Sequence, residues 1–273
     1  MPKINVHTIR IDFHVTATIE RFVYVYVVEA EHIYLIDPGV FGSERQILEC
    51  LANIGKDASD IKGIFLTHAH PDHIGSAAWF QEQTGCKIYA SEGEKRWIED
   101  IDLQFKERPI PNFYGLAGKS SRVDVTVKGG DLIKPEEGLE IAVFSTPGHS
   151  HGDVSYLVDR KLFIGDAVPV KGDIPIFINE TEIRKTLGML EAIPWVESYY
   201  PAWDHVYSRD EMKSMLRDAR EIIDLLKSAV KETDEGMELP VLTDLVSGRL
   251  HMPMLKTNPL FMRTVACLRN GRS

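Results

Sequence analysis

The sequence predicts a layered α/β protein whose C-terminal end is helical. Apolar, β-branched segments alternate with helical segments between residues 33 and 91, which is typical of strands and helices packed in layers. Polar residues follow several of the apolar segments where a predicted strand ends. The stretches IYLIDPG and LFIGDA share this form, as do IFLTHAHPDH and VFSTPGHSHGD, so we expect two similar halves.

The predicted elements follow in order from these patterns. Strands rich in Val, Ile and Tyr are expected at 4–15 and 21–39, paired as hairpins. A helix at 42–55 has a Ser cap and ends at Gly55. A buried strand, a helix and another strand then occupy 61–67, 74–85 and 86–91. Later strands are predicted at 123–127, 139–146, 154–159, 161–167 and 198–202, and helices at 179–193, 208–232, 239–250 and 258–270.

Residues 99–122 fit neither a helix nor a strand. The stretch ERPIPNFYGLAGKSS contains two prolines and two glycines, and a loop of this length is usually a lid or a binding loop. We expect Phe105, Phe113 and Tyr114 to form a lid and the apolar wall of a substrate pocket. Ordinary packing under a long loop is the alternative for these aromatic side chains.

Composition and charge limit the class of protein. The chain has 273 residues, 44% of them hydrophobic, which is enough for a sizeable core. Its formal net charge of −10 argues against general nucleic-acid binding, because phosphate contacts depend on Lys and Arg. Residues 245–273 nevertheless contain Lys and Arg without any Asp or Glu. This basic segment is expected to pack on the acidic body, or alternatively to attract an anionic substrate.

The cysteines and the N-terminus indicate a cytoplasmic protein. Cys50, Cys86 and Cys267 are scattered without CxxC spacing, so neither a disulfide framework nor a cysteine zinc site is expected. The first residues lack the pattern of a secretion signal. No apolar run reaches the roughly 20 residues that a membrane helix needs. We therefore expect no membrane partner.

A dense group of histidines follows the predicted strand at 61–67. The stretch THAHPDH places three histidines and one aspartate between His68 and His73, and imidazole and carboxylate are common zinc ligands. In an extended segment His68 and His70 point to one side and can reach one ion. Pro71 turns the chain, which directs Asp72 and His73 toward a second ion. Such a density of ligand types favours metal binding over a surface loop or core histidines.

Six residues cannot complete two metal sites, so further ligands are expected from other strand ends. His149 lies in STPGHS, Asp166 in FIGDAV and His205 in YYPAWDHVY. A single histidine after a turn is usually not a metal ligand. The order of these three residues along the chain, each at the end of a predicted strand, nevertheless favours all three as ligands.

This pattern resembles the metallo-β-lactamase-fold hydrolase superfamily, in its glyoxalase II-like and lactonase-like branch, over residues 20–208. HxHxDH at 68–73, TPGH at 146–149, GD at 165–166 and the late histidine carry the resemblance, and LIDPG at 35–39 also fits it. The resemblance implies a four-layered αββα sandwich of two mixed β-sheets flanked by helices. Residues 1–208 would form the catalytic domain, and 209–273 a small helical C-terminal region.

The resemblance also implies roles for individual residues. The implied metal ligands form two sets with a shared bridge: His68, His70 and His149 for one ion, Asp72, His73 and His205 for the other, and Asp166 between them. A hydroxide between the ions would be the nucleophile. Asp72 would also be catalytic by orienting that hydroxide, and Asp37 would fix the ligand loop. The cofactor is expected to be two divalent ions, zinc first, although iron and manganese suit the same ligands.

The remaining histidines are expected to be structural, and two neighbours of the implied ligands stay open as alternatives. His151 follows two residues after His149, and Asp204 precedes His205, so either side chain is an alternative ligand.

The resemblance implies hydrolysis of a small ester-like substrate, with a thioester favoured and a lactone next. The stretch after Asp166 lacks the Gly/Cys/Arg-rich segment expected in glyoxalase II, so the substrate stays open. The alternatives are a mononuclear iron persulfide dioxygenase on the same fold, a phosphodiesterase and a metal-stabilised scaffold. We expect a small-molecule partner, with a homodimer left open.

Overall fold

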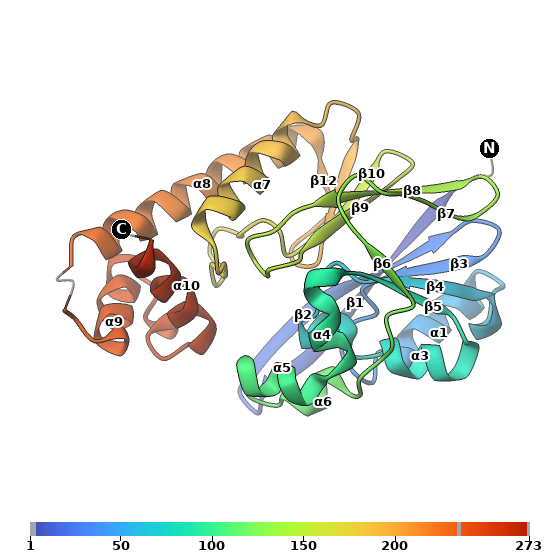
Figure 1. Ribbon diagram of the computed structural model, residues 1–273, viewed down its shortest axis with the longest axis horizontal. Helices are drawn as coiled ribbons and strands as arrows, with labels where there is room; N and C mark the ends of the chain where they lie inside the picture. The colour runs from blue at the N-terminus through green and yellow to red at the C-terminus, as the bar shows by residue number, and fades with distance from the viewer. Residues whose placement is uncertain (1–3, 234–235, 272–273) are drawn as a thin grey trace.

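The structure is a computed structural model that describes residues 4–233 and 236–271. Two sheets stack face to face, and helices cover the outer face of each (Figure 1). This arrangement confirms the four-layered αββα sandwich and the helical C-terminal end.

The first sheet carries the strand that leads into the histidine motif. Its order is β1-β2-β3-β4-β5-β6, with antiparallel pairs from β1 to β3 and parallel pairs from β3 to β6. The long β1–β2 hairpin is the one predicted from Val, Ile and Tyr content. The strands are β1 (Asn5–Thr16), β2 (Ile19–Glu29), β3 (Ile33–Ile36), β4 (Ile61–Phe65), β5 (Lys87–Ser91) and β6 (Val125–Val127).

The second sheet carries the later ligand candidates. Its order is β12-β11-β10-β9-β8-β7, and the β10–β11 pair is parallel while the other pairs are antiparallel. The strands are β7 (Leu132–Glu136), β8 (Leu139–Ser145), β9 (Val154–Val158), β10 (Lys161–Gly165), β11 (Ser198–Pro201) and β12 (Tyr207–Ser208).

Helices and short turns complete the outer layers. Those next to the first sheet are α1 (Glu44–Asn53), η1 (Ala58–Asp60), α2 (Pro71–Ile74), α3 (Ala77–Thr84), α4 (Glu92–Glu99), α5 (Ile101–Glu107) and α6 (Phe113–Ala117). Those next to the second sheet and beyond it are α7 (Glu180–Ala192), α8 (Arg209–Lys231), α9 (Leu239–Arg249), η2 (Pro253–Leu255) and α10 (Pro259–Asn270). The helices expected at 42–55 and 74–85 and those expected from residue 179 onward are therefore confirmed.

Side-chain alternation along the strands separates three apolar cores. In β2, Val25 faces the core beneath α1 and α3, whereas Tyr26 faces the core between the sheets. In β10, Phe163 faces the same central core, while Leu162 faces the core beneath α7 and α8. Since successive strand residues point to opposite faces, strands with apolar residues at every position are buried between two layers.

The C-terminal helices share their core with α7 and the second sheet. Leu226 of α8, Val246 of α9 and Phe261 of α10 lie in the same buried cluster as Leu162 and Tyr199. A boundary at residue 208 remains a prediction. Within the described part of the chain, none of the helices is both long and apolar enough to span a membrane.

The prediction of a loop at 99–122 is wrong in part, because this segment contains α5 and α6. Asp100 caps α5 by accepting a hydrogen bond from the Leu103 amide at 2.9 Å. Asn112 precedes α6 with a positive φ of 55°. Each helix is shorter than two full turns, so its apolar periodicity is hard to recognise in the sequence. The prolines and glycines of the segment therefore predicted a loop.

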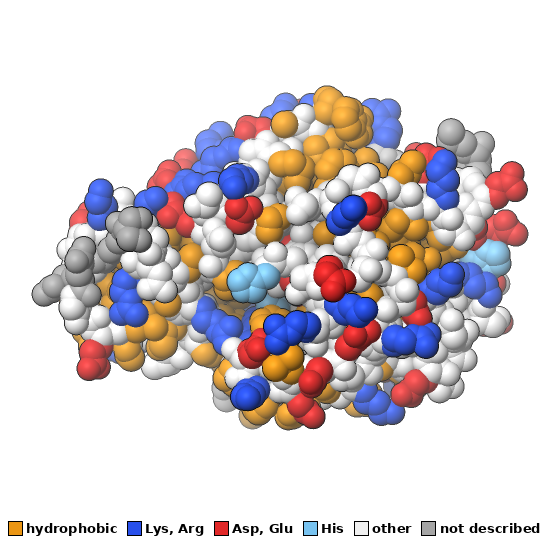
Figure 2. Space-filling view, in the orientation of Figure 1, with side chains coloured by type: hydrophobic (Ala, Val, Ile, Leu, Met, Phe, Trp, Pro, Cys, Tyr) orange, Lys and Arg blue, Asp and Glu red, His pale blue; other side chains and the backbone are white. Residues whose placement is uncertain are grey.

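Basic side chains of the C-terminal segment contact other parts of the chain. Arg249 pairs with Glu232 at 2.9 Å and Lys256 with Asp244 at 2.7 Å. Arg263 instead contacts the backbone of α5. Arg272 lies outside the described residues. Figure 2 shows acidic and basic side chains interspersed over one face of the molecule, so no single charge sign dominates that face.

Candidate metal centre

The histidine motif leaves the first sheet at the end of β4. The strand ends at Phe65, and His68 and His70 follow in an extended segment that is almost fully buried. Pro71 then occupies the first position of the short helix α2, where its missing N–H is no loss. The turn was expected to direct both Asp72 and His73 away from the preceding pair, but the His73 ring lies beside that of His68, with 4.0 Å between their centroids.

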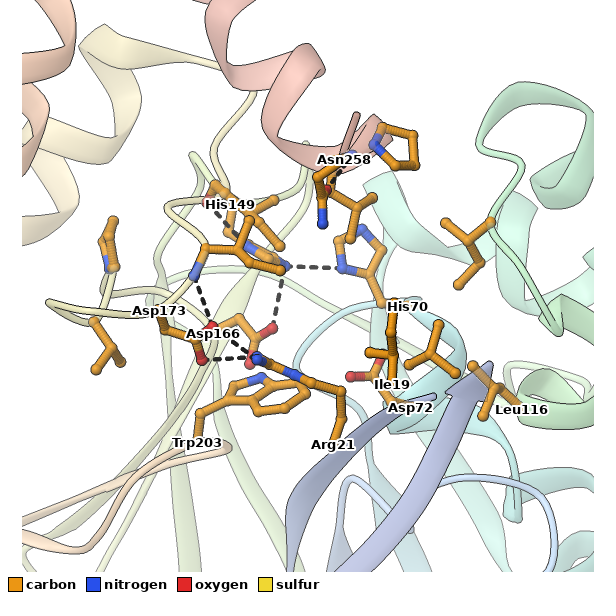
Figure 3. A pocket seen from close by; sticks show the side chains of 18 of the residues that line it. Ile19, Arg21, His70, Asp72, Leu116, His149, Asp166, Asp173, Trp203 and Asn258 are labelled. Atoms are coloured by element: carbon orange, nitrogen blue, oxygen red, sulfur yellow. Dashed lines mark hydrogen bonds and ion pairs between the residues drawn. The ribbon is translucent and has the colours of Figure 1, made fainter. Parts of the chain in front are cut away.

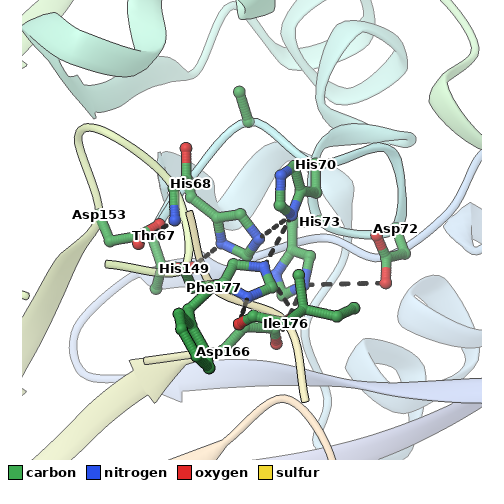
Figure 4. Close-up of polar contacts among 12 residues, drawn as sticks. Thr67, His68, His70, Asp72, His73, His149, Asp153, Asp166, Ile176 and Phe177 are labelled. Atoms are coloured by element: carbon green, nitrogen blue, oxygen red, sulfur yellow. Dashed lines mark hydrogen bonds and ion pairs between the residues drawn. The ribbon is translucent and has the colours of Figure 1, made fainter. Parts of the chain in front are cut away.

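Three histidine side chains and one carboxylate converge next to this segment (Figure 4). The Nδ1 atom of His70 lies 2.9 Å from Nε2 of His68 and 2.8 Å from Nε2 of His149. Asp166, which follows β10, places Oδ2 3.3 Å from the same His149 nitrogen. Each of the four residues offers a ligand atom within 4.8 Å of the others. This is the donor set of a nitrogen- and oxygen-ligated transition metal.

A second group shares Asp166 with the first. Nε2 of His73 lies 3.4 Å from Oδ1 of Asp166 and 3.9 Å from Oδ2 of Asp72. Both Nε2 of His73 and Oδ1 of Asp166 are buried without a hydrogen-bond partner. Buried polar atoms without partners are costly, and a shared metal ion would satisfy both. His73 also forms a possible ligand cluster with Asp37 and His68, whose ligand atoms lie within 4.8 Å of one another.

His205, predicted as the last ligand of the second ion, is not brought to this group. Its side chain is 56% exposed, and its ring packs on Tyr207 at 4.2 Å between centroids. Asp204 adopts a positive φ of 82°, which turns the chain outward into β12. Trp203 faces the site instead, and an indole offers no lone pair to a metal. A spacing pattern in the sequence could not reveal this local turn.

The two open alternatives also lie outside the ligand groups. His151 is exposed. Asp204 accepts hydrogen bonds from the Tyr207 hydroxyl and pairs with His205 at 3.0 Å. Of the described residues, neither belongs to a cluster that could hold an ion.

Burial controls the protonation of the first three histidines. It lowers the pKa values of His68 and His70 well below their usual range, and that of His149 in the same direction. Nearby histidines add to the shift for His68, and Arg108 adds to it for His70. The three imidazoles are therefore neutral near pH 7, which is the form that binds metals.

The pKa values of His73 and Asp166 each shift so that the charged form is favoured. Burial lowers the pKa of His73, but the surrounding carboxylates, led by Asp166, outweigh burial and raise it well above its usual range. Burial raises the pKa of Asp166, but His73 and His149 outweigh it and hold this pKa well below its usual range. The pair is thus ionised near pH 7, and a divalent cation would displace the His73 proton.

The centre forms the floor of a cavity of about 320 Å³. His70, Asp72, His149 and Asp166 line one side of it (Figure 3). Arg21 and Trp203 lie across from them, with the guanidinium carbon 4.4 Å from the ring centre. Much of the remaining wall is aliphatic, and it includes residues from both ends of the chain. An apolar cavity with a few convergent polar groups is typical of a small-molecule site.

The aromatic residues predicted to form the lid and pocket wall do not line this cavity. Phe105, Phe113 and Tyr114 pack against one another at 5.1–5.3 Å between ring centroids. The same segment reaches the cavity through Ile110 and Leu116 instead. Aliphatic side chains of this segment therefore face the site, whereas Phe113 is buried elsewhere and Phe105 and Tyr114 are exposed.

A profile of the metallo-beta-lactamase superfamily matches residues 18–226. The chain belongs to this superfamily. Hydroxyacylglutathione hydrolase of Thiobacillus denitrificans is 26% identical over 209 residues, which cover 76% of this chain and 72% of that protein. The probable metallo-hydrolase YqgX of Bacillus subtilis is 31% identical over 156 residues, covering 55% of this chain and 66% of that protein.

The metallo-beta-lactamase fold extends over nearly the whole chain. The crystal structure of a metallo-beta-lactamase family protein from Thermus thermophilus matches with a TM-score of 0.76. The match covers 98% of this chain and 93% of that one, at 17% identity, so it shows the fold alone. Family membership and the histidine-rich clusters together identify a metallo-hydrolase of the superfamily.

Asp37 supports the ligand segment of this superfamily member. It follows β3 with a φ of 50°, and its carboxylate accepts hydrogen bonds from the Thr67 amide at 2.8 Å and the Thr67 hydroxyl at 2.6 Å. Its Oδ2 atom also lies 2.9 Å from Nδ1 of His73. The structure thus places Asp37 where it can orient His73, the role that the sequence predicted.

Sequence reasoning missed Glu94, which joins the two ligand loops. This buried residue of α4 accepts hydrogen bonds from the Ala69 amide at 2.9 Å, the Ser150 hydroxyl at 2.5 Å and the Gly152 amide at 2.7 Å. One weak signal was available: Glu94 lies four residues before the buried Ile98, so it faces inward on the helix. A buried carboxylate at that position indicates a structural or functional partner.

Proposed function

We propose that the protein is a metal-dependent hydrolase of a small ester-like substrate, with a thioester favoured and a lactone next. The observation that carries this proposal is the convergence of His68, His70, His149 and Asp166 on the floor of an apolar cavity. The thioester preference rests on the relative named hydroxyacylglutathione hydrolase, which is 26% identical.

Each of the two proposed ions would be held by its own group of residues. His68, His70 and His149 would hold one ion, Asp72 and His73 would hold the other, and Asp166 would serve both. Zinc suits these nitrogen and oxygen donors best, and iron and manganese also fit. Bound ions would polarise the ester carbonyl and make a water molecule nucleophilic near neutral pH.

The chain's own residues supply positioning and proton handling. Asp72 lines the cavity with its side chain 18% exposed, so its carboxylate can accept a hydrogen bond from a water and orient it. Nδ1 of His73 is held by Asp37, which leaves Nε2 directed at Asp166. The aliphatic wall excludes bulk water from the acyl chain, which strengthens the electrostatic contacts within the cavity.

Metal analysis combined with a substrate panel tests the proposal. Protein purified without chelators is expected to contain zinc and to hydrolyse a thioester, or more weakly a lactone. His68→Ala is expected to abolish turnover while the far-ultraviolet circular dichroism stays that of the wild type. Full activity of the His68→Ala variant, or turnover that resists complete metal removal, would overturn the proposal.

A mononuclear iron persulfide dioxygenase is the second candidate, and the position of His205 favours it. Without His205, the second ion has only Asp72, His73 and the shared Asp166 among the described residues. A single iron per chain together with oxygen uptake on a persulfide, and no thioester turnover, would select this alternative.

A further inference from the structure

A cation that forms no ion pair within the described residues lies in the cavity wall. Arg108 follows the last residue of α5 and lines the cavity together with His70 and Asp72. The residue is only 6% exposed, and its Nη1 atom is buried without a hydrogen-bond partner. A buried guanidinium is costly unless it is paired, so one that faces a ligand cavity indicates a binding role.

The other arginine of the cavity is already neutralised. Arg21 donates to both carboxylate oxygens of Asp173, at 2.8 Å and 2.7 Å (Figure 3). The nearby acidic residues do not neutralise Arg108 in the same way. Asp72, Asp166 and Glu94 act on Arg108 without forming an ion pair with it within the described residues. Asp72 and Asp166 belong to the metal-ligand groups, where bound cations would offset their charge. The Glu94 carboxylate accepts hydrogen bonds from Ala69, Ser150 and Gly152.

The C-terminal helices add positive potential beside Arg108. Arg263 of α10 donates to the Glu107 carbonyl at 2.5 Å, and within the described ranges it forms no ion pair. Burial, with a further contribution from Arg263, lowers the pKa of Arg108 to about 10, so its side chain remains cationic at neutral pH. The start of α10 also reaches the cavity through Asn258 and Pro259, and a helix N-terminus is electropositive.

We propose that Arg108 binds an oxyanion group, a carboxylate or a phosphate, of the substrate whose ester-like bond lies at the metal centre. This inference rests on the proposed hydrolase function. The planar guanidinium suits both groups because it can donate two parallel hydrogen bonds. The aliphatic side chains of Ile110 and Leu116 share the cavity with it and would contact the chain between the two ends of the substrate.

Two thioesters that differ in one terminal group test this inference. S-butyryl and S-succinyl N-acetylcysteamine have acyl chains of similar length, but only the succinyl group carries a carboxylate. The variants are Arg108→Gln, Arg108→Lys and, as the matched control, Arg96→Gln, whose side chain on α4 is 71% exposed. Steady-state kinetics and metal content are measured for each.

The wild type is expected to prefer the succinyl thioester. Loss of one charged hydrogen-bonding group typically costs about 10- to 100-fold in binding. Arg108→Gln should raise KM for the succinyl substrate by this factor relative to KM for the butyryl substrate. Arg108→Lys should recover part of the loss, and Arg96→Gln should match the wild type. Equal losses on both thioesters, or no loss on the succinyl one, would overturn the inference.

A binding measurement separates this inference from the proposed function. If neither thioester is hydrolysed, the thioesterase proposal fails, and ligand-induced shifts in melting temperature then test Arg108 alone. Succinate or inorganic phosphate should stabilise the wild type more than Arg108→Gln, whereas neutral succinamide should not discriminate. The larger of the two shifts identifies carboxylate or phosphate as the preferred group, and identical shifts in both proteins would refute the role of Arg108.

Discussion

The Nδ1 atom of His73 lies 2.9 Å from the Oδ2 atom of Asp37, and both side chains are almost fully buried. Because the same carboxylate also accepts two hydrogen bonds from Thr67, it joins the end of β3 to the segment after β4. The orientation of His73, in the segment after β4, is therefore set by Asp37, which follows the neighbouring strand β3.

Asp37→Asn is expected to weaken binding of the second ion while the fold is retained. Asn tolerates the positive φ of 50° at this position, but its amide carries no charge and holds His73 less strongly. Loss of such a supporting carboxylate typically costs about 10- to 100-fold in metal affinity. Competitive titration against a chelator measures this change, with the exposed Asp57→Asn as the control. An affinity equal to that of the wild type would contradict the role assigned to Asp37.

His205→Ala is expected to leave metal content and turnover unchanged, because its side chain is 56% exposed and directed away from the centre. His149→Ala should remove the first ion, since this histidine contacts both His70 and Asp166. Elemental analysis of the two variants and of the wild type measures the number of metal ions per chain and so tests both expectations. Loss of an ion from His205→Ala would show that the loop after β11 closes over the centre when metal binds.

The metal-free protein is expected to be most stable near pH 6.5, because the histidines shift in both directions. Burial lowers the pKa values of His68, His70 and His149, so below about pH 6.5 the unfolded chain binds more protons and stability falls as the pH falls. The pKa of His73 is raised, so above about pH 6.5 the folded chain holds the extra proton, and this contribution is lost as the pH rises through the raised value.

Melting temperatures of the chelator-treated protein between about pH 5 and pH 8 measure this dependence. His70→Ala should flatten the acid side of the curve, because it removes one of the three histidines whose pKa is lowered. An acid side as steep in His70→Ala as in the wild type would argue against neutral, buried imidazoles.

Gly152→Ala is expected to disturb the loop that carries His149. A Cβ atom there would lie 2.8 Å from the Gly93 Cα atom and 3.0 Å from the Glu94 amide nitrogen, so backbone must move. Overpacking of this kind costs about 1–3 kcal/mol, and the shift should also lower metal affinity. Gly188→Ala is the control, because its Cβ meets nothing within 4 Å and Ala favours the α7 helix. Equal stability of the two variants would contradict the close packing of these loops.

Much of the fold was predictable because local patterns agree with the tertiary structure. The strand pattern of β2, the capped start of α8 at Ser208 and the left-handed Gly85 after α3 are each visible in the sequence. The motif between His68 and His73 was equally informative, because strand periodicity and the Pro71 turn determine where its side chains point.

The rest depended on contacts between distant segments. The outward turn at Asp204 follows from pairing of β11 with β12, which no local pattern near His205 reveals. Glu94 and Arg108 lie near the histidine motif only because α4 and α5 pack beside it, and no local sequence pattern shows this packing. Similarly, the mutual packing of Phe105 and Tyr114 left Ile110 to face the cavity.

The first ligand group draws on both sheets, since His68 and His70 follow β4 in the first sheet while His149 and Asp166 follow β8 and β10 in the second. An ion bound by these four residues is consequently a cross-link between two halves of the chain, neither of which supplies all four donors. A chain cut in the connection between β6 and β7 would yield two fragments that assemble this four-residue group only together. In such a split protein, metal uptake would report the reassociation of the halves.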